Sequence, residues 1–182
     1  VVFEYQMKRA SGYSGTWLPM NLAVTGKDSS NNTDNGFAID DSAQSTVSVT
    51  RYYKFRIRSN AGLVSEEVEV TAFDSTDLGV SFLVNFKSLQ VFHAGDLNFW
   101  HWRDESGMKE IEEADNEFRK AVAPICEKKV DLAFFPLDPR LGTMFEAGAN
   151  YFILSVKPRI MIPMHYFHRA DIAMEYARTA SC

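Results

Sequence analysis

Three side chains of metal-binding type follow short apolar runs in the second half of this 182-residue chain. His93 and Asp96 lie in the segment VFHAGDLNFWHW, residues 91–102, and His165 ends the segment PRIMIPMH. Zinc accepts imidazole nitrogens and carboxylate oxygens, and a zinc-bound water ionises near neutral pH to give a hydroxide nucleophile. These residues therefore predict a metal-dependent hydrolytic site, provided that the fold brings them together.

A structural interpretation of the same residues stays open. His93 and His165 can serve as hydrogen-bonded residues at strand ends, and Asp96 can cap the turn after Gly95. An acid–base pair of Asp96 and His165 without a metal is a further alternative. The aromatic residues of the same segment, which include two tryptophans, can stack on a sugar or an aromatic ligand, or they can form a packed loop.

The elements predicted from residue 73 onward indicate how these residues could meet. The predicted strands are 79–84, 89–94, 130–137 and 158–165, and the predicted helices are 108–125, 143–156 and 169–179. This β-β-α-β-α-β-α order implies a layered α/β unit, in which ligands bind beyond the carboxyl ends of the strands. Polar residues follow three of these strand ends: His93 to Asp96, then Asp138, then His165.

Some details of these elements are also predicted. The first helix is expected to stop near Pro124, because proline lacks the backbone N–H that a helix needs. The strands 130–137 and 158–165 are nearly continuous apolar runs, which is typical of strands buried on both faces.

Residues 1–72 have a different pattern. Short runs with β-branched and aromatic residues at near-alternate positions predict strands, and segments rich in Gly, Ser, Asn and Asp, such as 25–36, predict turns and loops. These regular short strands indicate an antiparallel β-sandwich. The chain is therefore expected to be an α+β or α/β protein with two domains, 1–72 and 73–182, and only the second contains histidines and cysteines.

The composition excludes several functional classes. The formal net charge of −5 leaves no basic surface for nucleic acid, and no apolar run is long enough to span a membrane. The two cysteines form no disulfide framework and no CxxC pair, which favours a reducing cytoplasm. We expect Cys126 to be a buried thiol and Cys182 to be a frayed terminal residue.

The motifs of the second half resemble a known family. The segments STDLGVSFLV, VFHAGDLNFWHW, VDLAFFPLDPRLG, GANYFI and KPRIMIPMHYF occur in the order found in the carboxyl-terminal half of metallo-β-lactamase-fold hydrolases. The resemblance covers residues 73–170 and is strongest to the compact bacterial branch with lactonase-like members. It implies half of an αβ/βα sandwich with zinc at the site. Asp96 would bridge two metals, His165 would be a metal ligand, and His93 would be a neighbour of the site.

The sequence departs from that family in its ligands. The HxHxDH motif that supplies the principal ligands is absent, and a histidine expected near residues 73–77 is missing, where Asp77 is an alternative oxygen ligand. Asp138 and His168 can lie in a second shell or face the substrate, although the family assigns them no role. Because a catalytic zinc site normally needs three protein ligands, we expect weak or no catalysis unless another segment or chain supplies the rest.

The first half resembles a different module. The stretch YYKFRIRSNAGLVSEEVEV is similar to the closing strands of a fibronectin type III-like domain, and this second resemblance covers residues 2–71. The chain thus resembles two partial modules joined near residues 70–75. Half of a metallo-β-lactamase sandwich leaves an apolar sheet face uncovered, which the β half or a second copy in a homo-oligomer would cover. Alternative functions are a non-catalytic chimeric or binding module, and an adhesion or carbohydrate-binding module; the small-molecule substrate stays unnamed.

Overall fold

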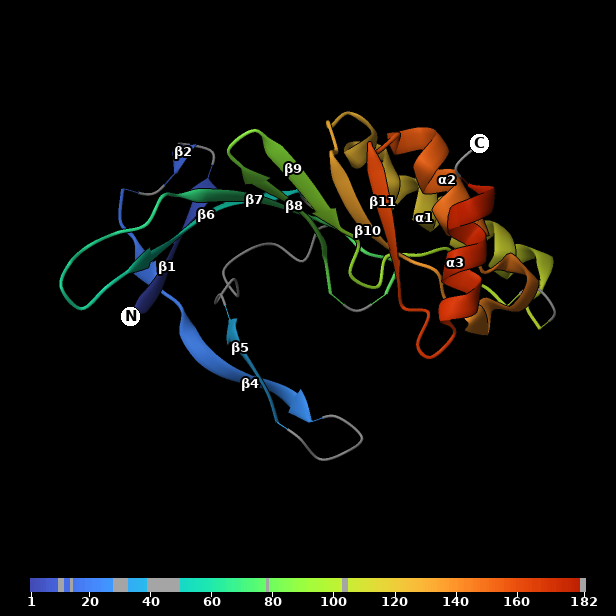
Figure 1. Ribbon diagram of the computed structural model, residues 1–182, viewed down its shortest axis with the longest axis horizontal. Coiled ribbons are helices and arrows are strands. Elements are labelled where there is room, and N and C mark those ends of the chain that lie inside the picture. Colours follow the sequence, from blue (N-terminus) through green and yellow to red (C-terminus); the bar gives the residue numbers. More distant parts are fainter. Residues whose placement is uncertain are drawn as a thin grey trace. The chain divides into compact units, whose positions relative to one another are not determined.

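The chain is a mixed α/β protein, and its architecture is given by a computed structural model (Figure 1). The structure describes residues 1–9, 12–13, 15–27, 33–38, 50–77, 79–102 and 105–180. The chain divides into two compact units, Val1–Val70 and Thr71–Cys182, and this division lies next to the predicted boundary at 72–73. Within the described residues, no helix is both long and apolar enough to cross a membrane.

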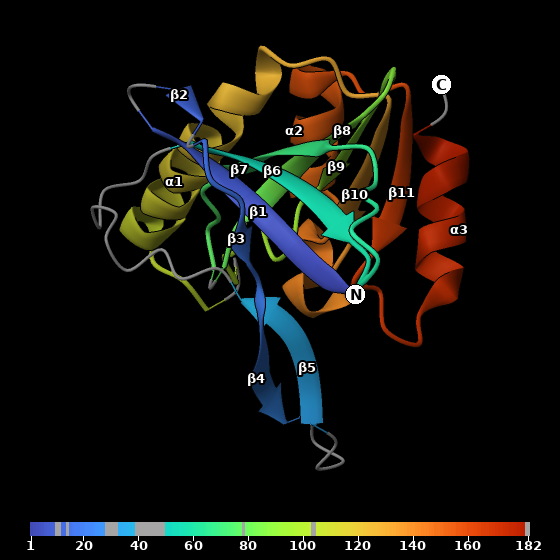
Figure 2. The same cartoon turned by 90° about the vertical axis from the view of Figure 1, so that its left-hand side faces the viewer.

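The first unit is built from β-strands in its described part. Its strands are β1 (Val2–Arg9), β2 (Gly12–Tyr13), β3 (Leu18–Pro19), β4 (Asn21–Lys27), β5 (Thr33–Ala38) and β6 (Arg51–Arg58). Strand β1 pairs antiparallel with β2, β3 and β6, and β4 pairs with β5 (Figure 2). The prediction of antiparallel strands is confirmed, but segment 25–36, expected to be a loop, contributes to both β4 and β5. Strand β7 (Val68–Phe73) spans the division between the units.

A buried carboxylate fixes the pairing of β1 with β6. Glu4 is 5% exposed, and its two oxygens accept hydrogen bonds of 2.7 Å from the Nε atoms of Arg56 and Arg58. These bonds lower the pKa of Glu4. The Arg56 guanidinium also lies 4.1 Å from the centroid of the Trp17 ring, a distance typical of a cation–π contact.

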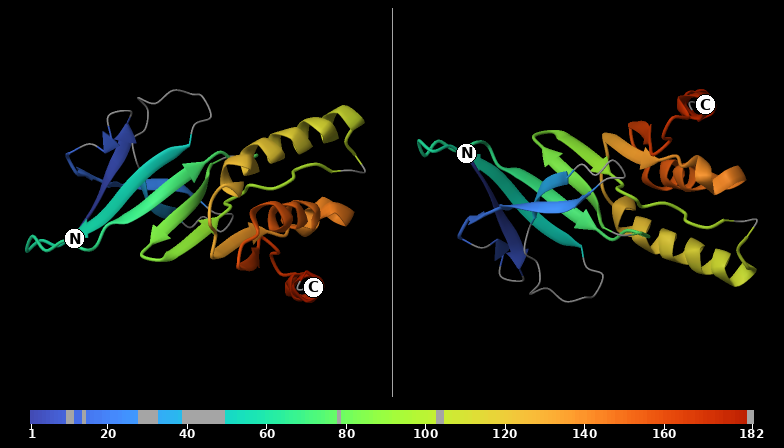
Figure 3. Two further views of the ribbon diagram at one scale, coloured as in Figure 1. Left: turned by 90° about the horizontal axis from the view of Figure 1, so that it is seen from above. Right: turned by 90° about the horizontal axis from the view of Figure 1, so that it is seen from below.

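The second unit contains a mixed sheet and helices. Its elements are β8 (Ser81–Phe86), β9 (Leu89–His93), α1 (Met108–Cys126), β10 (Leu132–Pro136), the 3₁₀ helix η1 (Pro139–Met144), α2 (Ala147–Val156), β11 (Ile160–Met164) and α3 (Ala170–Thr179). The order β8-β9-β10-β11 combines an antiparallel β8–β9 hairpin with parallel β9–β10 and β10–β11 pairs. Helices α1 and α2 (yellow and orange in Figure 3) lie side by side next to this sheet. The predicted element order of this half is confirmed.

An aromatic core joins the sheet to the helices. Phe92 of β9, Phe135 of β10 and Phe152 of α2 are fully buried. The Phe152 ring centroid lies 5.2 Å from that of Phe92 and 4.6 Å from that of Phe135. Helix α3 reaches the same core through Tyr176, whose hydroxyl donates to Asn150 Oδ1 at 2.9 Å. Burial of the phenol raises the pKa of Tyr176 to about 12.

Helix α1 ends at Cys126, shortly after Pro124, so the predicted end of this helix is confirmed. Two other detailed predictions were wrong. No residue of β11 is fully buried, and Ile160 and Ile162 are 60% and 40% exposed, because β11 is the end strand of its sheet rather than a central one. Cys126 is exposed instead of buried, since it is the last residue of α1, and Cys182 lies outside the described residues.

Candidate functional site

The candidate site lies where three parallel strands end. Strands β9, β10 and β11 run in the same direction, so their carboxyl ends meet at one edge of the sheet. The backbone continues this alignment beyond the strands, because Ala94 N donates to Phe134 O at 2.9 Å and Leu137 N donates to Met164 O at 2.8 Å. The residues that follow these strands are therefore held close together.

The turn after β9 requires glycine at position 95. Gly95 has a φ of 58°, and a Cβ atom there would lie 2.7 Å from the carbonyl oxygen of Val80. Glycine avoids both the left-handed strain and this collision. Gly95 thereby permits the turn that carries Asp96. A hydrogen bond of 2.7 Å from the Trp100 indole N–H to Asp96 O holds this turn in place.

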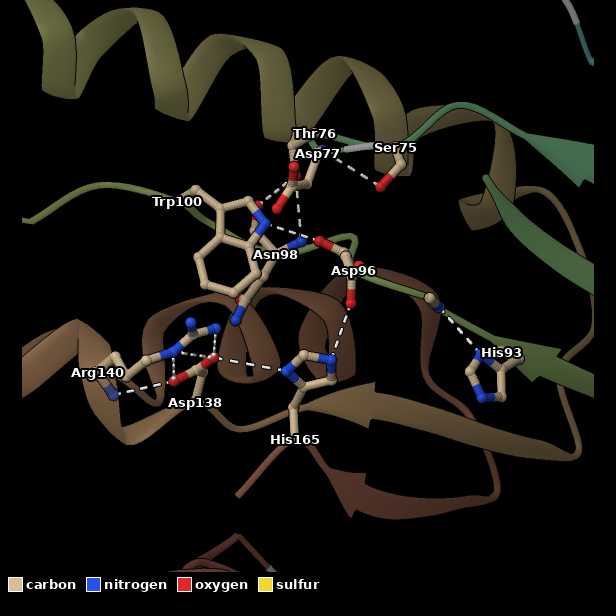
Figure 4. A network of polar contacts seen from close by, with 11 residues as sticks. Ser75, Thr76, Asp77, His93, Asp96, Asn98, Trp100, Asp138, Arg140 and His165 are labelled. Atoms are coloured by element: carbon tan, nitrogen blue, oxygen red, sulfur yellow. Dashed lines mark hydrogen bonds and ion pairs between the residues drawn. The ribbon is translucent and has the colours of Figure 1, made fainter. Parts of the chain in front are cut away.

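Four side chains form a continuous polar network at this edge, which we call the Asp96–Arg140 network (Figure 4). His165 lies between two carboxylates: its Nε2 is 2.8 Å from Asp96 Oδ1, and its Nδ1 is 3.5 Å from Asp138 Oδ2. Arg140 donates through Nε to both Asp138 oxygens, at 2.9 and 3.0 Å, and through Nη2 to Oδ2 at 2.5 Å. The sequence prediction that Asp96 and His165 could meet is consistent with this geometry. Asp138 lies beside His165, at a distance too long for a good hydrogen bond to Nδ1.

The burial of Asp138 makes its charge depend on Arg140. The Asp138 side chain is fully buried, whereas the Asp96 and His165 side chains are 43% and 33% exposed. Burial raises the pKa of Asp138, but hydrogen bonds from the Arg140 side chain and backbone N–H outweigh it, so the pKa lies below its usual value. Asp138 also raises the pKa of Arg140, and so do the charges of Asp96 and Asp77.

His93 does not join this network. Its Nδ1 accepts a hydrogen bond of 3.0 Å from Gly95 N, and its ring stacks on Phe82 with the centroids 5.2 Å apart. Phe134 lies on β10 with its ring centroid 5.8 Å from that of His93. Burial lowers the pKa of His93, which favours the neutral imidazole. These contacts match the alternative interpretation of His93 as a hydrogen-bonded residue at a strand end.

The remaining predicted residues lie around the network at different depths. His168 is exposed in the loop before α3, and the contacts that form the network join other residues. Asp77 is exposed and influences Arg140 through its charge. The Trp100 and Trp102 rings stack on each other with centroids 6.4 Å apart, and the Arg140 guanidinium lies 5.8 Å from the Trp100 centroid. The packed-loop interpretation of the tryptophans fits these contacts.

Three residues that support the loop were not singled out in the sequence. Thr76 Oγ1 donates to Asn98 O at 2.5 Å and accepts from Asn98 N at 3.1 Å. The fully buried Asn98 side chain accepts from Phe99 N at 2.8 Å, while its Nδ2 has no acceptor among the described residues. Gly148 of α2 allows this packing, because a Cβ there would lie only 2.1 Å from Asn98 Oδ1. The sequence signal for this role is the position of Asn98 between the apolar residues Leu97 and Phe99, which could have indicated a buried asparagine.

The donor set fits part of a metal site. Asp96 Oδ1 and His165 Nε2 are an oxygen and a nitrogen of the kinds that zinc binds, and both side chains are accessible. The described part of the chain holds no group of three His, Cys, Asp or Glu side chains arranged for a metal. Two protein ligands are fewer than the three that a catalytic zinc normally has. The chain therefore offers two ligands to a metal, not a complete set.

Comparisons with protein-family models, with curated proteins and with solved structures found no match.

We expect Gly148→Ala to destabilise the second unit by about 1–3 kcal/mol, because the new methyl group would collide with the buried Asn98 amide. This loss opposes the roughly 1 kcal/mol that alanine normally gains over glycine in a helix. Urea unfolding followed by fluorescence measures the change. Gly15→Ala is the control, because a Cβ there meets nothing within 4 Å. Equal stability of Gly148→Ala and the wild type would contradict the described packing.

The Asp138 carboxylate should make stability depend on acid pH. Its pKa is lowered in the folded protein, so its contribution is present above the unfolded-state pKa of about 3.9 and is lost as the pH falls through the lower folded value. Asp138→Asn should lose about 1–3 kcal/mol at neutral pH, where the charged hydrogen bonds to Arg140 are made. It should also lose less additional stability than the wild type on acidification. Unfolding free energies measured from neutral to strongly acidic pH test this, and parallel curves would contradict it.

Proposed function

We propose that the chain carries part of a metal-dependent hydrolase site, with Asp96 and His165 as two of the metal ligands. In this proposal the second unit is the carboxyl-terminal half of a metallo-β-lactamase-type sandwich, and the first is a fibronectin type III-like segment. The substrate is a small molecule of unnamed class, and the protein acts in the cytoplasm. Catalysis by the chain alone is weak or absent.

One observation carries this proposal: Asp96 Oδ1 and His165 Nε2 converge to 2.8 Å from two different strand ends. A carboxylate and an imidazole from separate elements converge at an accessible position, as metal ligands must. The motif resemblance that covers residues 73–170 assigns metal-binding roles to the same two side chains.

Asp138 supports His165 in this proposed role. Ligating histidines commonly donate their second ring N–H to a carboxylate, which fixes the tautomer and the orientation of the ring. The Asp138 carboxylate lies 3.5 Å from Nδ1 of His165 and is itself held by Arg140. A proton on Nδ1 leaves the lone pair of Nε2 free for a metal ion. When bound, such a metal would supply a water of lowered pKa as the nucleophile.

The alternative is a non-catalytic binding module in which the same contacts are structural. A neutral imidazole has one N–H, whereas an imidazolium can donate to both Asp96 and Asp138. In that form the network would be a carboxylate–imidazolium–carboxylate–guanidinium chain that stabilises the three strand ends without any metal. The two functions differ in whether a metal binds between Asp96 and His165.

Metal content and zinc titration distinguish these functions. We expect zinc to bind the purified protein with an affinity weaker than that of a complete three-ligand site, and we expect Asp96→Ala and His165→Ala each to weaken binding at least tenfold. His168→Ala is the matched control, because His168 is exposed and outside the network. Isothermal titration calorimetry measures the affinity, and metal analysis measures what copurifies.

Two outcomes would overturn parts of this proposal. If zinc does not bind at micromolar concentration, or if both variants bind like the wild type, Asp96 and His165 are not metal ligands and the binding-module alternative stands. If about two tightly held ions per chain copurify and both variants lose them, the site is complete and the expectation of weak catalysis is wrong.

We also propose that a second copy of the chain covers the outer face of the second unit's sheet. Residues that alternate with the core residues of β8 to β11 form this face, and they include the partly buried Phe82, Val91 and Phe134 and the 40% exposed Ile162. Light scattering should show a homo-oligomer, and Ile162→Lys should shift it toward the monomer. Leu154→Lys is the control, since Leu154 is 73% exposed on α2. A wild-type monomer would contradict this part of the proposal.

A further inference from the structure

The turn after β9 contains a hydrogen bond that only a neutral imidazole can accept. Gly95 N donates to His93 Nδ1 at 3.0 Å (Figure 4). A ring nitrogen that accepts a hydrogen bond carries no proton of its own, so the neutral ring of His93 has its proton on Nε2. An imidazolium has an N–H group on both nitrogens and offers no acceptor. Protonation of His93 therefore removes the partner of the Gly95 N–H.

Two other hydrogen bonds of the turn end on backbone carbonyl oxygens, which do not titrate. Leu97 N donates to Ala94 O at 3.0 Å, and the Trp100 indole N–H donates to Asp96 O at 2.7 Å. These two bonds act on Asp96 and on the residues that follow it. The bond to the imidazole acts instead on the residue directly before Asp96.

That residue is a glycine, which makes its hydrogen bond important for the backbone. Gly95 has a φ of 58°, and glycine adopts positive and negative φ about equally well. Its own side chain thus does little to fix its conformation, so the bond from its N–H to His93 is a restraint that the residue itself does not supply. This bond limits where the backbone can place the next residue, Asp96.

The surroundings of His93 favour its neutral form. The ring lies between residues of the two flanking strands, with its centroid 5.2 Å from that of Phe82 on β8 and 5.8 Å from that of Phe134 on β10. Burial lowers the pKa of His93, the charge of Asp96 raises it, and His165 lowers it. Because the net change is downward, the imidazole is neutral at neutral pH and takes up a proton under acidic conditions.

We propose that His93 is a positioning residue for Asp96 and acts as a proton-dependent latch on the turn that carries it. With a neutral imidazole the Gly95 N–H is bound and the turn is fixed. With an imidazolium this bond is broken and the turn is loosened. The latch needs no metal, so the inference goes beyond the proposed function and does not depend on it. It predicts that the position of Asp96 changes below about pH 6.5, the ordinary pKa of histidine.

NMR spectra of metal-free, nitrogen-labelled protein test the latch between roughly pH 8 and pH 5. We expect the Gly95 amide signal and the Trp100 indole signal, whose N–H contacts Asp96 O, to shift with the same midpoint as the His93 ring. The hydrogen-exchange protection of the Gly95 N–H should fall by about twofold to tenfold below that midpoint, as expected for the loss of one hydrogen bond. The indole of Trp17, which belongs to the first unit, is the control and should not follow this midpoint.

Two variants separate the latch from simple packing. His93→Asn keeps an acceptor, its amide oxygen, but does not titrate in this range, so it should protect the Gly95 N–H at every pH tested. His93→Phe keeps an aromatic ring between the flanking strands but has no acceptor, so Gly95 should be weakly protected at both ends of the range. His168→Asn is the matched control, because it removes an exposed histidine outside the Asp96–Arg140 network and should keep the wild-type transition.

The midpoints of these titrations decide the outcome. A wild-type Gly95 signal that does not follow the His93 ring would overturn the inference. A folded His93→Asn variant that keeps the transition would also overturn it, because another group would then be moving the turn. The wild-type comparison is decisive by itself if a variant does not fold. Zinc binding, on which the proposed function depends, is measured separately and is not affected by either result.

Discussion

The parallel alignment of β9, β10 and β11 is the constraint on which the candidate site depends. Residues far apart in the chain meet only because three strands end at the same edge of one sheet. The buried rings of Phe92, Phe135 and Phe152 hold β9 and β10 in place against α2, since each of these elements can shift only by breaking the stacking of the rings. Close packing of this kind has few alternative arrangements. The position of the polar network is therefore a consequence of the apolar core beneath it.

The charge of Asp138 is the second constraint. A fully buried carboxylate is costly unless it is paired and hydrogen-bonded. Arg140 meets this requirement from only two residues away, where the start of η1 also directs its backbone N–H at the carboxylate. The same pairing gives His165 a fixed neighbour on one ring nitrogen and leaves the other nitrogen facing Asp96. The pairing with Arg140 that compensates for the burial of Asp138 thus also places a carboxylate beside the accessible His165.

The sequence predicted the order of the elements, because hydrophobic periodicity follows from local pattern. Strand-end placement indicated how Asp96 and His165 could meet, but not that they do. It did not predict the exposure of β11, since an end strand and a central strand of a parallel sheet can have the same apolar composition. The orientation of His93 could have been predicted from the sequence. Successive strand residues point to opposite faces of a sheet, and the neighbouring Phe92 is buried in the core. The roles of Arg140, Asn98 and Gly148 depend on packing between distant segments, and a single sequence carries no direct record of those contacts.

The Asp96–Arg140 network is continuous, although it offers a metal only two ligands, Asp96 and His165. A buried carboxylate needs a charged or hydrogen-bonding partner, whereas exposed groups are solvated by water. Here Asp138 is buried while Asp96 and His165 remain accessible. Burial of Asp138, together with exposure of Asp96 and His165, leaves only the last two of these three groups open to solvent.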